Sequence, residues 1–144
     1  MFVVDASVAI NWVFADEDSR RSGPWLGRLA IDDALVPPHF FLETGNAFVL
    51  AARRGRMSKE QLRSAGRLLD GLDLTIDALS LDEAGLHAAI GVSVELAIRH
   101  GLTVYEAAYL ELAIRRGLPL ATLDEALAAA APATGVELLA VAGV

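Results

Sequence analysis

The chain has 144 residues, no cysteine, 54% hydrophobic residues and a formal net charge of −7 at pH 7. This length and composition indicate one folded domain spanning residues 1–144, and the lack of cysteine excludes disulfide bonds, a thiol nucleophile and cysteine-bound zinc. The acidic balance argues against tight non-specific binding of nucleic acid, which requires a basic surface.

Short apolar segments alternate with segments of helical pattern along the chain. In chain order, we expect strands at 2–5, 34–37, 74–77 and 118–122, with a weaker fifth at 136–139. We expect helices at 7–15, within 22–32 from Pro24, and at 38–54, 58–71, 80–100, 103–116 and 124–131. This alternation predicts an α/β fold with a mainly parallel sheet covered by helices on both faces.

Single acids interrupt or follow the apolar runs at four places: Asp5, Glu43, Glu106 and Asp124. Burying a carboxylate is costly unless another group compensates its charge. Asp5 and Asp124 follow predicted strands, and ligands of such sheets bind at the carboxyl ends of the strands. Several carboxylates converging there would be compensated most simply by a hard divalent cation, which prefers oxygen ligands.

Helix capping offers another role for three of these acids. Asp5 and Asp124 each precede a predicted helix and could cap its first turn, although Ser7 competes with Asp5 for that role. Glu106 stands three residues after Thr103, which is the spacing of a capping box. The segments 58–61 and 80–83 have the same capping-box spacing, and nothing in their sequences indicates a catalytic role. The sequence leaves both roles open.

Glu43 is the acid with the weakest structural explanation. It lies inside a predicted helix beside aromatic residues, and no lysine or arginine stands three or four positions away. At helical spacing it shares a face with His39 and Asn46. An unpaired glutamate is rarely fully buried, so a role as a ligand or polar partner is favoured. The three histidines lack partners at zinc spacing, and we expect them to be structural.

Basic residues are concentrated in two places despite the acidic total. Arg115 and Arg116 form one basic pair. The larger cluster comprises Arg53, Arg54, Arg56, Arg63 and Arg67. These side chains either lie on a solvated helix face or form a rim that contacts phosphate. In the second interpretation the candidate RNA-binding residues are Arg53, Arg54 and Arg56.

Four successive segments carry a resemblance to a known family: VVDASVAI at 3–10 with Trp12, ETGNA at 43–47, LTVYEAAY at 102–109 and LPLATLD at 118–124. In this order and spacing they resemble the motifs of PIN-domain ribonucleases, most of all the VapC-type toxins of type II toxin–antitoxin systems. The resemblance covers nearly the whole chain. It implies an α/β/α sandwich and an endoribonuclease that depends on Mg²⁺ or Mn²⁺.

The resemblance also implies roles for individual residues. The catalytic and metal-binding acids would be Asp5, Glu43, Glu106 and Asp124, with Ser7, Asn46 and Thr122 as supporting polar residues. At the third acid the family ordinarily has aspartate, in the sequence Tyr-Asp-Ala, whereas this chain has Glu106. The added methylene displaces the carboxylate by roughly one carbon–carbon bond, and such displacements are costly in a positioned site.

The implied partners are a cognate VapB-type antitoxin, an RNA substrate such as tRNA or rRNA, and a second copy of the chain in a homodimer. The high hydrophobic content agrees with an apolar surface that a partner covers. We expect a cytoplasmic protein that does not enter the membrane. No apolar run is long enough to span a bilayer, and Asp5 interrupts an N-terminus that lacks the basic start of a signal peptide.

Other phosphoryl-transfer proteins fit the motifs less well. A haloacid-dehalogenase-like phosphatase needs a second acid two positions after Asp5, where this chain has Ser7. A receiver domain needs paired acids and a late lysine, but the only lysine is Lys59, in a predicted helix. A second interpretation stays open, in which an inactive PIN fold serves as a protein-interaction or regulatory module. Glu106 and the acidic balance favour that interpretation.

Overall fold

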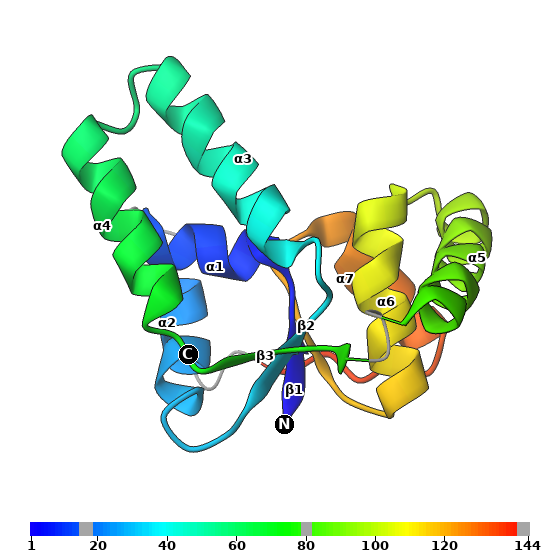
Figure 1. Ribbon diagram of the computed structural model, residues 1–144. Coiled ribbons are helices and arrows are strands. Elements are labelled where there is room, and N and C mark those ends of the chain that lie inside the picture. The colour runs from blue at the N-terminus through cyan, green and yellow to red at the C-terminus, as the bar shows by residue number, and fades with distance from the viewer. Residues whose placement is uncertain (15–18, 79–81, 141–144) are drawn as a thin grey trace.

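The structure is a computed structural model that describes residues 1–14, 19–78 and 82–140. Strands and helices alternate along the chain, as Figure 1 shows. In order, the elements are β1 Phe2–Val4, α1 Ala6–Val13, α2 Ser19–Arg28, β2 Ala34–Val36, α3 Phe40–Arg53, α4 Lys59–Asp70, β3 Leu74–Ile76, α5 Glu83–His100, α6 Val104–Arg116, β4 Leu120–Ala121 and α7 Glu125–Ala133.

The four strands form a parallel sheet in the order β3-β2-β1-β4. The central strand is β1, in which Phe2 pairs with Ala34 of β2 and Val4 pairs with Ala121 of β4. Every residue of β1, β2 and β4 is buried. Uninterrupted apolar runs are typical of parallel strands that are covered on both faces.

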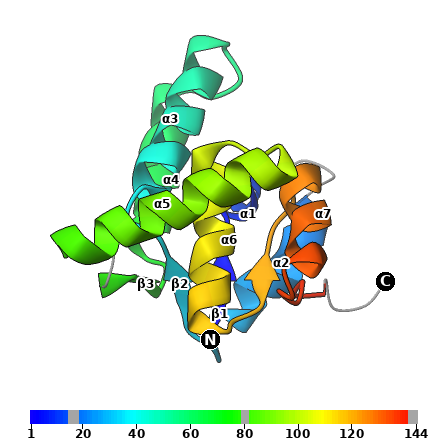
Figure 2. The ribbon, with the colours of Figure 1, turned by 90° about the vertical axis from the view of Figure 1, so that its right-hand side faces the viewer.

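Helices cover the two faces of the sheet. In Figure 1, α1 to α4 lie on one side of β1, and α5, α6 and α7 lie on the other side, which faces the viewer in Figure 2. The core contains β1, β2 and β4 together with Tyr109 and Leu110 of α6, both fully buried. The predicted α/β class and the three-layer α/β/α sandwich are therefore confirmed. None of the described helices combines the length and apolar character needed to cross a membrane.

Two expected element positions are wrong. Pro24 does not begin a helix, because α2 starts at Ser19 and contains Pro24. The neighbouring Trp25 is 3% exposed, and its burial stabilises the helix despite the backbone donor that proline lacks. The expected fifth strand is, in the described residues, a single parallel bridge between Leu120 and Leu138. Its partner β4 has only two residues, so little more pairing is possible.

Local capping signals position several helices. The capping boxes expected at 58–61 and 103–106 both form. The third box, expected at 80–83, involves Ser80, which lies outside the described residues. The helix α5 has Asp82 as its N-cap, and the Asp82 carboxylate accepts a hydrogen bond from the backbone N–H of the third helical residue. Short-range polar contacts therefore define where these helices start.

The carboxyl ends of β1 and β4 lie side by side. The backbone N–H of Asp5 donates a 3.0 Å hydrogen bond to the carbonyl oxygen of Ala121, and Thr122 follows directly. The chain leaves the sheet here, because α1 begins after Asp5 and α7 begins after Asp124. This is the edge at which parallel α/β sheets bind ligands.

Candidate active site

Asp5 is a buried carboxylate at the end of the central strand. It is 3% exposed, and its Oδ2 accepts hydrogen bonds from the hydroxyls of Ser7 and Thr122. Burial raises the pKa of the Asp5 carboxyl above its ordinary value, the two hydroxyl donors lower it in part, and the nearby charge of Asp124 raises it further. The ionised form of Asp5 is therefore costly in this place and would be stabilised by a cation.

Ser7 and Thr122 connect the two strand ends through their hydroxyls. The Ser7 Oγ donates to Asp5 and accepts a 3.0 Å hydrogen bond from the backbone N–H of Leu123. The Thr122 Oγ1 donates to Asp5 at 2.7 Å and accepts from the backbone N–H of Asp124 at 3.0 Å. Two of the three predicted supporting residues, Ser7 and Thr122, thus fix Asp5 relative to the loop after β4.

Asp124 caps α7, as the sequence allowed. Its Oδ1 accepts a 2.7 Å hydrogen bond from the backbone N–H of Leu127. The same carboxylate is close enough to raise the pKa of both Asp5 and Glu43. Asp124 therefore caps α7 and also interacts electrostatically with Asp5 and Glu43.

Glu43 lies in the first turn of α3 and is held by a residue of α6. The hydroxyl of Tyr109 donates a 2.7 Å hydrogen bond to Glu43 Oε2, and His39 Nε2 lies 3.9 Å from the same oxygen. Burial raises the pKa of Glu43, the bond from Tyr109 lowers it, and the charges of Asp5, Glu106 and Asp124 raise it. The other three predicted acids are therefore electrostatically coupled to Glu43.

Tyr109 was not predicted as a site residue. It is fully buried, and burial together with the adjacent Glu43 carboxylate raises the pKa of its phenol far above the ordinary value. The phenol therefore keeps its proton and acts as a donor. A sequence signal did exist, because Tyr109 stands three positions after Glu106 on α6 and so shares its helix face.

Glu106 forms the predicted capping box. Its Oε2 accepts a 2.8 Å hydrogen bond from the backbone N–H of Thr103, whose Oγ1 accepts from the Glu106 N–H at 3.2 Å. Its charge nevertheless raises the pKa of Glu43. The position of Glu106 is therefore consistent both with capping of α6 and with a role among the candidate metal-binding acids, which are the two roles that the sequence left open.

The four acids do not form a closed metal cage in the described residues. Within the described parts of the chain, no three His, Asp or Glu side chains are grouped closely enough to enclose an ion. The hydrogen bonds to the side chains of Glu43, Glu106 and Asp124 each use one carboxylate oxygen, which are Oε2, Oε2 and Oδ1 respectively. Mg²⁺ does not require such a cage, because it is usually bound through one or two carboxylates and several waters.

The remaining predicted residues make no hydrogen bond or ion pair with the four acids in the described part of the chain. Asn46 is exposed one turn after Glu43, and no contact among the described residues joins it to the acids. Arg53 lies ten positions after Glu43, roughly 15 Å along the axis of α3. Arg54 and Arg56 are also exposed, near the end of the arm that α3 and α4 form in Figure 1.

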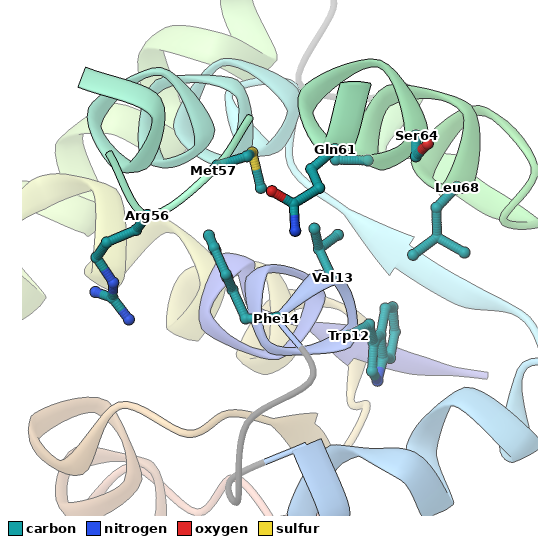
Figure 3. A pocket seen from close by; sticks show the side chains of 9 residues that line it. Trp12, Val13, Phe14, Arg56, Met57, Gln61, Ser64 and Leu68 are labelled. Atoms are coloured by element: carbon teal, nitrogen blue, oxygen red, sulfur yellow. The ribbon is translucent and has the colours of Figure 1, made fainter. Parts of the chain in front are cut away.

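Arg56 also takes part in a second feature, a cavity of about 450 Å³ between α1 and α4. Figure 3 shows Arg56 beside Phe14, with Trp12, Met57 and Gln61 also lining the cavity. The Arg56 guanidinium lies 5.7 Å from the centre of the Phe14 ring, a cation–π contact. Arg56 therefore has a structural contact that Arg53 and Arg54 do not show in the described residues.

The pair Arg115 and Arg116 neutralises a buried acid. Asp77 is fully buried after β3, and its carboxylate binds Arg115 at 2.9 Å and Arg116 at 3.2 Å. Arg115 also binds Glu111 at 2.7 Å. These contacts favour a structural role for the second basic pair over a phosphate-binding rim.

Comparison with known proteins identifies the family. The sequence matches the PIN domain over residues 2–132, which is most of the chain, so the protein belongs to the PIN-domain family. Among solved structures, PAE2754 from Pyrobaculum aerophilum is similar with 23% identity and a TM-score of 0.61, over 90% of this chain and 78% of that one. FitAcB from Neisseria gonorrhoeae is similar with 15% identity and a TM-score of 0.62, over 96% of both chains.

These two likenesses support the fold, since identities below a quarter of the aligned residues say little about chemistry. No curated protein sequence matches the chain. The expected resemblance to PIN-domain proteins is therefore confirmed at the level of the family.

Proposed function

We propose that this protein is a divalent-cation-dependent endoribonuclease and the VapC-type toxin of a toxin–antitoxin pair. The family supports this class, because PIN domains are commonly metal-dependent nucleases. The observation that carries the proposal is the buried Asp5 at the end of β1, electrostatically coupled to Asp124 and, with it, to Glu43. A carboxylate group of this kind is compensated by a hard cation.

Each acid would have a different role at the phosphate that reacts. A bound Mg²⁺ or Mn²⁺ lowers the pKa of a water and neutralises charge that develops on the phosphate. Asp5 and Asp124 would hold this cation directly. Glu43 would bind it or orient the attacking water, and Glu106 would complete its surroundings with the oxygen that does not cap α6. Ser7 and Thr122 would keep Asp5 in place.

Substrate and partners follow from the same proposal. The exposed Arg53, Arg54 and Arg56 would contact phosphates of a tRNA or rRNA substrate, with Asn46 as a polar residue on the side of α3. A VapB-type antitoxin and a second copy of the chain would cover apolar surface, of which Leu42 at 78% exposed is an example. The activity places the protein in the cytoplasm, where these RNAs are found.

One alternative is favoured by a specific observation. Glu106, which stands where the family has aspartate, uses an oxygen to cap its own helix. A PIN fold whose third acid is committed to capping would serve as a protein-interaction or regulatory module without catalysis. The two proposals differ in whether a pure preparation cleaves RNA.

The test is cleavage of small structured RNAs by the purified chain in Mg²⁺ or Mn²⁺. We expect cleavage that stops with EDTA, and a loss of about 100-fold or more in Asp5→Asn, which lacks a ligand charge. The matched control is Glu125→Gln, an exposed acid in the first turn of α7. Circular dichroism and thermal unfolding should show both variants folded.

The outcomes separate the two proposals. Full activity in Asp5→Asn would refute the assignment of the acids. The absence of cleavage by every wild-type preparation would favour the interaction module. Growth arrest on expression, relieved by an adjacent small gene, would support the toxin role.

A further inference from the structure

We propose that Tyr109 is a positioning residue for Glu43, and that its hydroxyl holds the Glu43 carboxylate in the orientation in which it faces a bound cation. This inference rests on the proposed function, because it concerns the same site. It extends that function by assigning a role to a residue that carries no charge and that the acids alone do not reveal.

The hydrogen bond itself is short and joins two helices that are distant in sequence. Tyr109 Oη donates to Glu43 Oε2 at 2.7 Å, and 66 positions separate the residues. This distance is typical of a hydroxyl that donates to a charged carboxylate, which is about twice as strong as a neutral hydrogen bond. The contact fixes α3 and α6 to each other at the edge of the sheet where Asp5 lies.

Tyr109 is well placed to act as a fixed donor. Its side chain is fully buried on α6, so its ring has little freedom. The ring of His39 packs edge-on against it, with centroids 5.1 Å apart and planes at 67°. A buried tyrosine hydroxyl needs a polar partner, and here that partner is a candidate metal ligand.

Glu43 depends on this donor for its orientation. The side chain is 34% exposed and has several rotatable bonds, so it would sample many directions without a partner. Its neighbour His39 is 3.9 Å away, beyond hydrogen-bond distance. The bond to Tyr109 occupies one carboxylate oxygen and leaves the other for a ligand.

A merely structural role would have different consequences. If Tyr109 only joined α3 to α6, removing its hydroxyl would lower stability but leave cation affinity unchanged. If it positions Glu43, removing the hydroxyl weakens cation binding only while Glu43 is present. Polar partners that orient metal ligands typically change affinity by about 10-fold to 100-fold.

The experiment measures Mn²⁺ binding to the full chain without RNA, by electron paramagnetic resonance of free Mn²⁺. The variants are Tyr109→Phe, Glu43→Gln and the double variant, with Tyr105→Phe as the control. Tyr105 lies on the same helix but is 64% exposed. We expect Tyr109→Phe to weaken binding by about 10-fold or more, and the double variant to match Glu43→Gln.

The possible results are distinguishable. Unchanged Mn²⁺ affinity in Tyr109→Phe, with wild-type binding intact, would overturn the inference while leaving the proposed nuclease standing. An equal loss in the presence and absence of Glu43 would also overturn it, since the effect would then be global. A wild-type chain that binds no Mn²⁺ would reject the metal site and this inference together.

Discussion

The hydroxyl of Thr122 donates a 2.7 Å hydrogen bond to Oδ2 of Asp5, although 117 positions separate the two residues. The same hydroxyl oxygen accepts the backbone N–H of Asp124 at 3.0 Å. One side chain therefore joins two of the candidate acids across the ends of β1 and β4. This arrangement makes Thr122 a sensitive position for testing the site without changing its charge.

We expect Thr122→Val to weaken both the fold and the site. Valine has nearly the same shape but cannot donate to Asp5, and it leaves the Asp124 N–H without its acceptor. Hydrogen bonds to charged groups contribute about 2 kcal/mol, so the free energy of unfolding should fall by about that amount. Cation-dependent cleavage should fall by about 10-fold or more. Urea denaturation and cleavage rates measure the two effects.

The control for this substitution is Thr122→Ser, which keeps the hydroxyl and should retain most of the activity. If valine and serine behave alike, the hydroxyl does not organise the site.

The Asp5 carboxyl should contribute stability to the metal-free protein that is lost as the pH rises. Burial raises the pKa of Asp5 above its ordinary value of 3.8, so the folded state binds more protons than the unfolded state. The stabilising contribution of protonated Asp5 is complete below pH 3.8 and is lost as the pH rises through the raised value. Urea denaturation in EDTA at a series of pH values measures this change.

The comparison with Asp5→Asn isolates the effect, because other carboxyls act in the opposite direction. The pKa of Asp32, for example, is lowered by the N-terminal amine and Arg28. The wild-type protein should lose stability relative to Asp5→Asn with rising pH, and added Mg²⁺ should oppose that loss. A constant difference between the two proteins would contradict the raised pKa.

The buried Asp77 should make Arg115 more important for stability than Arg116. Arg115 binds Asp77 and Glu111, whereas the more exposed Arg116 contacts Asp77 alone among the described residues. We expect Arg115→Met to lower the free energy of unfolding by about 2 kcal/mol and Arg116→Met by about 1 kcal/mol or less. Chemical denaturation of the two variants tests the order, and equal effects would contradict it.

Arg53 should contribute to RNA binding and not to cation binding. The measurement uses an Asp5→Asn background, which cannot cleave RNA. There, Arg53→Ala should make the plot of the logarithm of the RNA-binding constant against the logarithm of the salt concentration less steep, by about 0.7 for each phosphate that the arginine neutralises. Arg99 is a matched control, because it is also exposed in the last turn of a long helix. Equal slopes for Arg53→Ala and Arg99→Ala would place the RNA elsewhere.

The candidate acids could be selected from the sequence because their signals are local. Asp5 and Asp124 follow apolar strands, and the carboxyl ends of parallel strands meet at one edge whatever the rest of the chain does. Glu43 was recognisable because no lysine or arginine stands three or four positions away from it on its own helix. The capping box of Glu106 was visible as a spacing of three residues, since such contacts form within one turn.

The partners of these acids were decided only by the tertiary structure. Asp77 also follows a strand, yet packing places Arg115 and Arg116 against it and makes it part of an ion-pair cluster. Tyr109 reaches Glu43 because α3 and α6 converge at the edge of the sheet. Periodicity and spacing report neighbours within a few residues, whereas hydrogen bonds across 66 or 117 positions depend on how whole elements pack. The chain by itself thus indicated the candidate acids, and the packing determined that Asp77 is neutralised by arginines while Asp5 and Glu43 are held by hydroxyl donors.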